Sequence, residues 1–328
     1  MSDIRPTTWR GLAAWELESS AVRAVVVPEM GAKIVSLRDK RSGFEWLVGP
    51  IPGRPVRPVA YPAPFERQDM AGWDEMFPTI VACAYPGPGP HQGTALPDHG
   101  EAWQLPWEVI RCQGELALTL TGRALPYRLT RAASLAAPDV LCLQYTLENL
   151  GSAPMPYLWA AHPQFVAGPG CRVMLPPQVT EVVNTIPAEW GWGPPETRLT
   201  WPEAAMPDGR RERLDESGPA TLHRGRKLFA LPEARPSWAA LRREDLGHWL
   251  CMEWNPAEVP YLGLWVDEGA VHCETVAAPE PGTGWYDSLA LAWQKGRVCT
   301  VPAGGTRRWT LTVRLGTRGD PFAPPVCL

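Results

Sequence analysis

Apolar and polar side chains alternate one by one along several stretches of this chain, and this alternation limits it to β-structure. Leucine alternates with alanine and threonine in residues 116–121, and similar patterns recur in residues 141–148 and 309–315. Successive side chains of a strand point to opposite faces of a sheet, so a period of two predicts half-buried strands. Earlier in the chain we expect three short strands and one turn, at residues 9–18, 21–27, 33–38 and 28–31 respectively.

Helical spacing is rare in this sequence. The best candidate is residues 287–294, where Asp287 or Ser288 caps the start and Gly296 marks the end. A weaker helix is expected within residues 235–249. No change of composition marks a domain boundary, and no repeat of fixed period is present. We therefore predict an all-β fold with few short helices, formed as a single domain over residues 1–328.

Composition excludes several classes of function. The 328 residues carry a formal net charge of -4 with scattered lysines and arginines, so neither a nucleic-acid nor a membrane partner is indicated. The 8 cysteines form no C-x-x-C pair, and no zinc or redox motif is visible. No apolar run resembles a signal core or a membrane span, so we expect a cytoplasmic protein. The 17 tryptophans suit sugar stacking, although indoles also pack protein cores.

His162 stands directly before a proline at the end of a strand pattern. Pro163 fixes its own φ angle and favours an extended conformation at His162. An imidazole can give and take a proton near neutral pH, and a stiff support suits that task. The structural alternative is a buried histidine that is hydrogen-bonded to a carbonyl group.

A cluster of aromatic and acidic residues lies between two proline-rich stretches. Residues 50–64 are rich in proline, and residues 86–90 alternate proline with glycine. Between them lie Trp73, Asp74 and Glu75. Loops carry functional residues disproportionately, so this cluster is either the rim of a site or the solvated tip of a surface loop.

Histidines and carboxylates from four separate stretches suit proton transfer at the anomeric centre of a sugar. Opening a hemiacetal ring needs a base for the anomeric hydroxyl and an acid for the ring oxygen, and it needs no cofactor. Free Glu titrates near ~4.3 and free His near ~6.5, so a Glu base and a protonated or hydrogen-bond-donating His are suitable at neutral pH. Hydrolysis by paired carboxylates among Asp74, Glu75 and Glu280 is an alternative, but it leaves the histidines without a role.

Six short motifs follow one another over nearly the whole chain: PEMGAKIVSL at 28–37, GWDEMFP at 72–78, His99-Gly100 followed by PWEV at 106–109, His162-Pro163-x-Phe165, PYLGLW at 260–265, and Glu280-Pro281 to Asp287. In this order they resemble the aldose 1-epimerase, or galactose mutarotase-like, superfamily, in particular its aldose-epimerase-like branch. The resemblance implies a single-domain supersandwich of antiparallel sheets with a sugar in an open cleft. It also implies that His162 is the general acid, that Glu280 is the general base and that His99 hydrogen-bonds the sugar.

Within these motifs the chain differs from the members of the superfamily that act on sugar phosphates, and the differences indicate whether its sugar carries a phosphate. Hexose-6-phosphate mutarotases of the superfamily carry Arg shortly after His-Gly, where this chain has Trp103, and basic groups where it has Asp74 and Glu75. Carboxylates repel phosphate and accept hydrogen bonds from hydroxyls, so we expect a non-phosphorylated, neutral aldose and no metal. The expected sugar-binding residues are His99, Asp74, Glu75, Trp73, Trp103 and Trp265.

Two alternatives remain open in the sequence. Glu274 also follows a strand-like pattern and competes with Glu280 for the role of base, although the step from Glu280 to Asp287 fits the family spacing. A non-catalytic sugar sensor would keep the cleft without the proton transfer. A homodimer is compatible with the tryptophan excess, because aromatic residues also favour interfaces.

Overall fold

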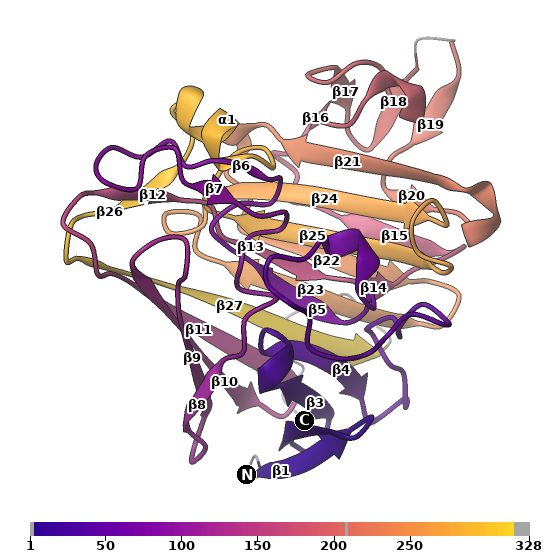
Figure 1. Ribbon diagram of the computed structural model, residues 1–328. Coiled ribbons are helices and arrows are strands. Elements are labelled where there is room, and N and C mark those ends of the chain that lie inside the picture. Colours follow the sequence, from indigo (N-terminus) through magenta and orange to yellow (C-terminus); the bar gives the residue numbers. More distant parts are fainter. Residues whose placement is uncertain (1–2, 207–208, 318–328) are drawn as a thin grey trace.

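Two antiparallel sheets dominate the computed structural model, which describes residues 3–206 and 209–317 (Figure 1). The larger sheet has twelve strands: β1 (Asp3–Trp9), β2 (Leu12–Glu18), β3 (Val22–Val27), β4 (Lys33–Asp39), β5 (Trp73–Met76), β13 (Ala160–Pro163), β14 (Phe165–Val166), β16 (Glu181–Asn184), β17 (Arg198–Thr200), β21 (Arg224–Ala230), β24 (Tyr261–Glu268) and β25 (Thr275–Gly282). Their order is β1-β2-β3-β4-β5-β13-β25-β24-β21-β16-β17, and β14 also pairs with β25.

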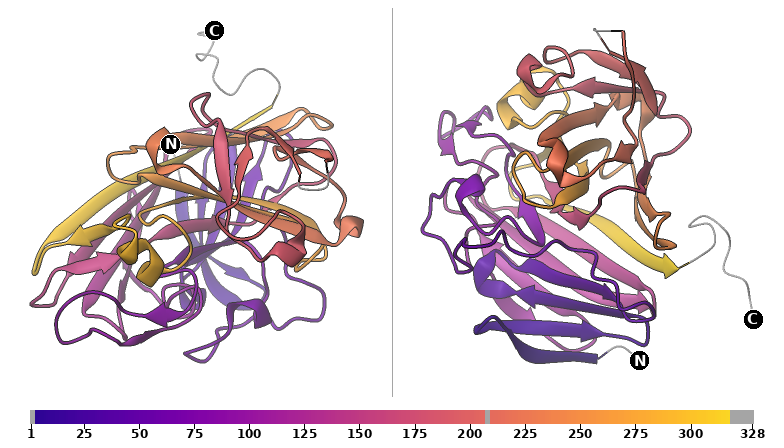
Figure 2. Two further views of the ribbon diagram at one scale, coloured as in Figure 1. Left: turned by 90° about the horizontal axis from the view of Figure 1, so that it is seen from above. Right: turned by 90° about the vertical axis from the view of Figure 1, so that its right-hand side faces the viewer.

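The second sheet has nine strands: β8 (Glu108–Arg111), β9 (Leu116–Thr121), β10 (Tyr127–Ala137), β11 (Val140–Asn149), β15 (Cys171–Met174), β20 (Glu216–Ser217), β22 (Trp238–Arg243), β23 (His248–Trp254) and β27 (Thr306–Thr317). Three short strand pairs complete the β-structure: β6 (Cys83–Ala84) with β7 (Ala95–Leu96), β12 (Met155–Tyr157) with β26 (Cys299–Val301), and β18 (Glu203–Ala205) with β19 (Arg211–Arg213). Figures 1 and 2 show the N-terminal strands and the β16–β19 region at opposite ends of the molecule.

Helices are short, as the sequence predicts. The α-helix is α1 (Leu289–Gln294), and the Ser288 side chain caps it by accepting a hydrogen bond from the backbone N–H of Leu291. The 3₁₀ turns are η1 (Pro28–Met30), η2 (Phe65–Arg67), η3 (Ala188–Trp190), η4 (Ala220–Leu222) and η5 (Pro232–Ala234). No helix in the described part of the chain is long and apolar enough to cross a membrane.

The expected strands at residues 21–27 and 33–38 are confirmed, the one expected at 9–18 is a hairpin turn followed by β2, and one expected helix is wrong. Residues 235–249 contain β22 and the start of β23, which pair antiparallel with Ala240 opposite Cys251. Gly247 between them has a φ of 67°, a left-handed conformation that glycine adopts easily and that lets the chain reverse. The turn at Gly247 therefore makes residues 235–249 part of a β-hairpin, where we expected a helix.

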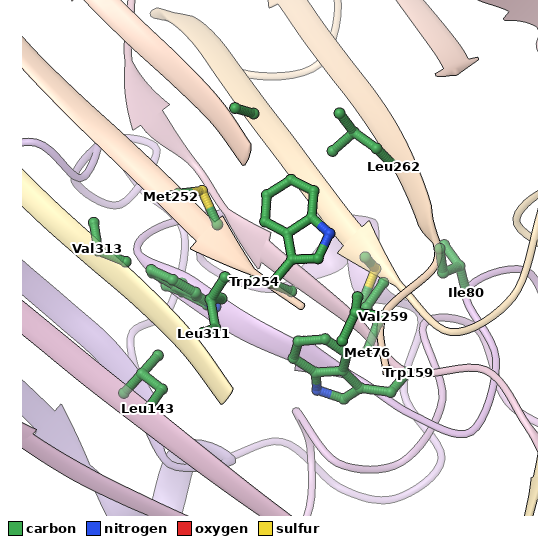
Figure 3. Close-up of a cluster of buried hydrophobic side chains, with 14 of the residues drawn as sticks. Met76, Ile80, Leu143, Trp159, Met252, Trp254, Val259, Leu262, Leu311 and Val313 are labelled. Carbon is green, nitrogen blue, oxygen red and sulfur yellow. The ribbon is translucent and has the colours of Figure 1, made fainter. Parts of the chain in front are cut away.

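The hydrophobic core lies where the two sheets face each other. One continuous cluster of buried side chains contains Leu17 and Ile34 of the larger sheet together with Leu118 and Leu143 of the second. Trp159 lies in this cluster near Met76, Val259 and Leu311 (Figure 3). In the described part of the chain this inner face is filled mainly with apolar side chains, which leaves no open space between the sheets for a ligand.

Candidate functional site

A cavity of about 330 Å³ brings together side chains from β13, β21, β24, β25 and the loops above them. Its walls are formed by Phe65, Glu66, Met70, Ile80, Val81, Asp98, His99, His162, Ile186, Lys227, Trp265, Val271, Glu280 and Asp287. Of the eight site residues expected from the sequence, the cavity contains His162, Glu280, His99 and Trp265. The volume falls within the range of small-molecule sites.

His162 and Glu280 face each other at a place where two neighbouring strands separate. β13 pairs with β25 only at Ala160 and Gly282, and pairing with β25 resumes at β14, where Phe165 lies opposite Ala277. In the gap, His162 Nε2 lies 3.7 Å from Glu280 Oε1. Glu280 Oε1 and His162 Nδ1 are buried and have no hydrogen-bond partner among the described residues. Both groups are therefore available to a ligand that enters the gap.

Lys227 is a member of the site that sequence reasoning missed. Its Nζ donates a hydrogen bond to Glu280 Oε2 and lies 3.3 Å from Asp287 Oδ1. Gly263 lies opposite Glu280 on β24, and a Cβ atom there would come within 3.3 Å of Glu280 Oε2. A small residue at 263 thus leaves room for the ion pair between Lys227 and Glu280.

Burial sets the proton affinities of the two central groups in opposite directions. Burial raises the pKa of Glu280 to about 7, with Lys227 acting to lower it and Asp287 to raise it. Burial also lowers the pKa of His162 well below its usual value, and the nearby His99, Lys227 and Lys33 lower it further. A low-dielectric site disfavours the charged form of each group. The pair therefore shares one proton at moderately acid pH, and in the free site this proton resides mainly on Glu280.

His99 is held in place by a strained turn and by an aromatic ring. It has a φ of 57°, and the following Gly100 has a φ of 71° with the backbone oxygen of Phe77 only 2.0 Å from where a Cβ would lie. His99 Nδ1 lies 3.0 Å from Asp98 Oδ1, and its ring stacks on Phe65 with centroids 3.9 Å apart. Because one ring nitrogen is engaged, the other is free to contact a ligand.

The three acidic and aromatic residues that we expected to hold the sugar, Trp73, Asp74 and Glu75, lie outside the cavity. All three are fully buried on β5, an internal strand between β4 and β13, and none lines the cavity. Glu75 points towards the second sheet, where Arg131 Nη1 and Tyr145 Oη each donate a hydrogen bond of 2.8 Å to it. Neutralised by these partners, the Glu75 carboxylate supports the core.

Asp74 and Trp73 also contact other buried side chains of the protein. Asp74 lies opposite His162 in the β5–β13 pairing, but it is fully buried and forms an ion pair with Lys33 at 3.3 Å. Trp73 packs edge-on against Phe165 at a centroid distance of 6.0 Å. Neither side chain lines the cavity.

Trp103 is likewise outside the cavity. It is 3% exposed, and its indole N–H donates a hydrogen bond to the Asp98 carbonyl oxygen at 3.2 Å. It packs edge-on against Phe65 with centroids 5.1 Å apart. Trp103 therefore supports the ring that stacks on His99 instead of meeting the ligand itself.

The competing carboxylate Glu274 lies elsewhere. It is exposed in the bend before β25, and it is absent from the cavity wall. The geometry thus favours Glu280 over Glu274. Within residues 3–206 and 209–317, no cluster of three His, Cys, Asp or Glu side chains is placed to hold a metal ion.

Comparison with known proteins identifies the fold. No protein-family model matches the sequence, and a search of curated proteins finds no match either. Solved structures do match: a galactose mutarotase-like protein from Lactobacillus casei is 18% identical with a TM-score of 0.65, and the match covers 92% of this chain and 100% of that one. A Klebsiella pneumoniae protein provisionally assigned as an aldose 1-epimerase is 13% identical with a TM-score of 0.69, covering 95% and 83% respectively. The Slr1438 protein from Synechocystis sp. PCC 6803 is 18% identical with a TM-score of 0.66, covering 97% and 100%. The chain therefore has the galactose mutarotase-like fold over nearly its whole length.

Proposed function

We propose that this protein is a sugar-binding aldose 1-epimerase that interconverts the anomers of a neutral aldose. The observation that carries the proposal is the pair of Glu280 Oε1 and His162 Nε2, 3.7 Å apart at the wall of a cavity large enough for a sugar ring. An unpaired carboxylate oxygen and an imidazole facing one cavity are the base and the acid that ring opening needs.

The shared proton gives a balanced reaction. In the reactive form the proton is on His162 and Glu280 is a carboxylate. Glu280 takes the proton from the anomeric hydroxyl while His162 protonates the ring oxygen, and the bond between the anomeric carbon and the ring oxygen breaks. This leaves protonated Glu280 and neutral His162, the distribution that burial favours in the free site. After rotation about the first carbon–carbon bond, the same transfers run in reverse and close the ring on the other face.

Charge in the cavity supports a sugar without phosphate. Four carboxylates line the wall, Glu66, Asp98, Glu280 and Asp287, whereas Lys227 is already paired with two of them. Such a wall repels an anionic group and accepts hydrogen bonds from hydroxyls. The preference first inferred from Asp74 and Glu75 thus rests on different residues. Trp265 and Phe65 offer apolar faces for the C–H side of a ring.

Polarimetry of freshly dissolved α-anomers of several neutral aldoses tests the proposal. We expect the wild type to accelerate mutarotation, and His162→Asn and Glu280→Gln to lose roughly 10²–10⁴-fold in kcat. Glu274→Gln is the matched control, since it removes an exposed carboxylate just before the same strand. Activity that survives Glu280→Gln but not Glu274→Gln would overturn the choice of base.

One observation favours a second function, that of a sugar-binding protein without catalysis. Burial lowers the pKa of His162 well below its usual value, which disfavours the imidazolium form that a general acid needs. Calorimetric binding of a neutral sugar together with unchanged mutarotation rates for the whole panel would identify the protein as a sensor.

A further inference from the structure

Lys227 holds the carboxylate of Glu280 by one oxygen. Lys227 projects from β21, opposite Trp265 of β24, into the same cavity as Glu280. Its ammonium group hydrogen-bonds Glu280 Oε2, and Glu280 Oε1 is left without a partner among the described residues, 3.7 Å from His162. The two oxygens of one carboxylate therefore have different surroundings.

Asp287 anchors this arrangement from the other side. Its carbonyl oxygen accepts hydrogen bonds from the N–H groups of Ile80 at 3.0 Å and Val81 at 2.8 Å. Its Oδ2 accepts a hydrogen bond from Thr185 Oγ1 at 3.3 Å, and its Oδ1 lies 3.3 Å from Lys227 Nζ. Lys227 thus links Glu280 to a carboxylate whose position is fixed by backbone contacts.

We propose that Lys227 is a positioning residue that holds Glu280 Oε2 so that Oε1 faces the anomeric hydroxyl and His162. This inference deepens the proposed function and rests on it for the identity of the reacting hydroxyl. A carboxylate held by one oxygen cannot turn away from the ligand, and pre-orientation of this kind contributes to catalysis without any contact to the sugar.

The same contacts tune how tightly Glu280 holds its proton. The groups that face Glu280 are Lys227 from β21, Asp287 before α1 and His162 from β13, whereas β24 presents the uncharged Gly263. Burial raises the pKa of Glu280, Lys227 opposes that rise, and Asp287 adds to it. Removing Lys227 should therefore raise the pKa of Glu280, and removing the charge of Asp287 should lower it.

Carbon-13 NMR of protein labelled at the glutamate side-chain carboxyl measures this directly in the absence of any sugar. The Glu280 signal is identified by its absence from Glu280→Gln. We expect its titration midpoint to rise by roughly 1–3 pH units in Lys227→Met, because an adjacent opposite charge shifts a carboxyl by that amount. In Asp287→Asn the midpoint should fall, and in Lys227→Arg it should stay near the wild-type value.

Arg224→Met is the matched control for the loss of a cation. Arg224 lies on the same strand but pairs with Glu268 and does not line the cavity. This variant should leave the Glu280 midpoint unchanged. If Lys227→Met does not fold, Asp287→Asn still tests the proposal. A Glu280 titration midpoint that rises or does not move in that variant would overturn it.

Steady-state kinetics distinguishes a role of Lys227 in positioning Glu280 from a role in binding the sugar. In Lys227→Met we expect kcat to fall by roughly 10²-fold or more while KM changes little. A rise in KM with unchanged kcat would show that Lys227 binds the sugar and would overturn the positioning role. A wild type that does not accelerate mutarotation contradicts the proposed function, whereas the NMR result for Lys227 is unaffected by that failure.

Discussion

Two buried lysines, each between two carboxylates, lie on different strands of the larger sheet, Lys33 on β4 and Lys227 on β21. Lys33 hydrogen-bonds Gln68 and Asp69 and lies 3.3 Å from Asp74, with all three charged side chains at most 1% exposed. Lys227 has the same kind of partners in Glu280 and Asp287, but Asp287 is 16% exposed and the group lines the cavity. In both clusters, burial raises the pKa of one carboxyl, Asp74 or Glu280, to about 7.

The difference shows that a perturbed pKa does not by itself mark a reactive group. Asp74 and Glu280 have similar proton affinities, yet only Glu280 faces a space that a ligand can enter. Structural ion pairs and functional sites both shift pKa values, so access decides between them. We therefore expect changes in the Lys33 cluster to alter stability and changes in the Lys227 cluster to alter activity.

Lys33→Met should have the largest effect on stability. It leaves Asp69 and Asp74 buried without a cation, and breaking a buried ion pair in this way costs ~3–5 kcal/mol of unfolding free energy. Lys227→Met should cost less, because the side chains of Lys227 and Asp287 are 9% and 16% exposed, whereas those of the Lys33 cluster are at most 1% exposed. Urea unfolding followed by tryptophan fluorescence measures both free energies. Equal losses of stability in the two variants would contradict the expected difference between the Lys33 and Lys227 clusters.

The pH dependence of activity should come from the cavity cluster. The reactive pair needs one proton, and this proton is lost as pH rises through the pKa of Glu280 at about 7. We expect kcat/KM to be nearly constant just below that pH and to fall about tenfold per pH unit above it, or ~100-fold by pH 9. Initial mutarotation rates at subsaturating sugar provide the profile, and a rise above pH 7 would contradict the shared-proton mechanism.

The pH dependence of stability should in part come from the sealed cluster. The folded pKa of Asp74 is about 7, above its unfolded value, so between the two the folded state binds more protons. Stability is then highest at low pH and is lost as pH rises through about 7. Asp74→Asn should remove roughly 2 kcal/mol of this decline, measured by urea unfolding at pH 5 and pH 8. A decline as steep as in the wild type would show that Asp74 stays ionised throughout.

Trp265→Ala should have the smallest effect of this series. Trp265 lines the cavity but carries no proton, and it packs against Trp190 with centroids 6.0 Å apart. Loss of one aromatic face should raise KM by an amount worth ~0.5–1.5 kcal/mol and leave kcat unchanged. Steady-state kinetics distinguishes this from a drop in kcat, which would assign Trp265 a part in aligning the reacting atoms.

Sequence reasoning succeeds where a local pattern decides the structure. The alternation in residues 116–121 and the Ser288 cap report short-range geometry, and both are found as expected in β9 and α1. It also singles out His162 and Glu280, because they occur in motifs of a known family, and the fold places them together.

The misplaced residues depend on partners that are distant in the chain. Acidic residues flanked by proline-rich stretches suggest either the rim of a site or the tip of a surface loop, but Glu75 is buried because Arg131 of β10 neutralises it. Lys227 could not be recognised from the sequence for the same reason, because it meets Glu280 only through a sheet order that places β21 two strands from β25. Sheet order, and with it the pairing of charges, is not visible in a single sequence.

The single pairing between β13 and β25 has a consequence for the time course of folding. The strand that carries His162 lies near the middle of the chain, and the strand that carries Glu280 lies near its end; their own contact is Ala160 with Gly282. Long-range pairings of this kind form slowly, because loop-closure entropy is lost before the contact stabilises the chain. During refolding, tryptophan fluorescence should therefore recover ahead of activity, and the return of mutarotation would report the pairing of β13 with β25.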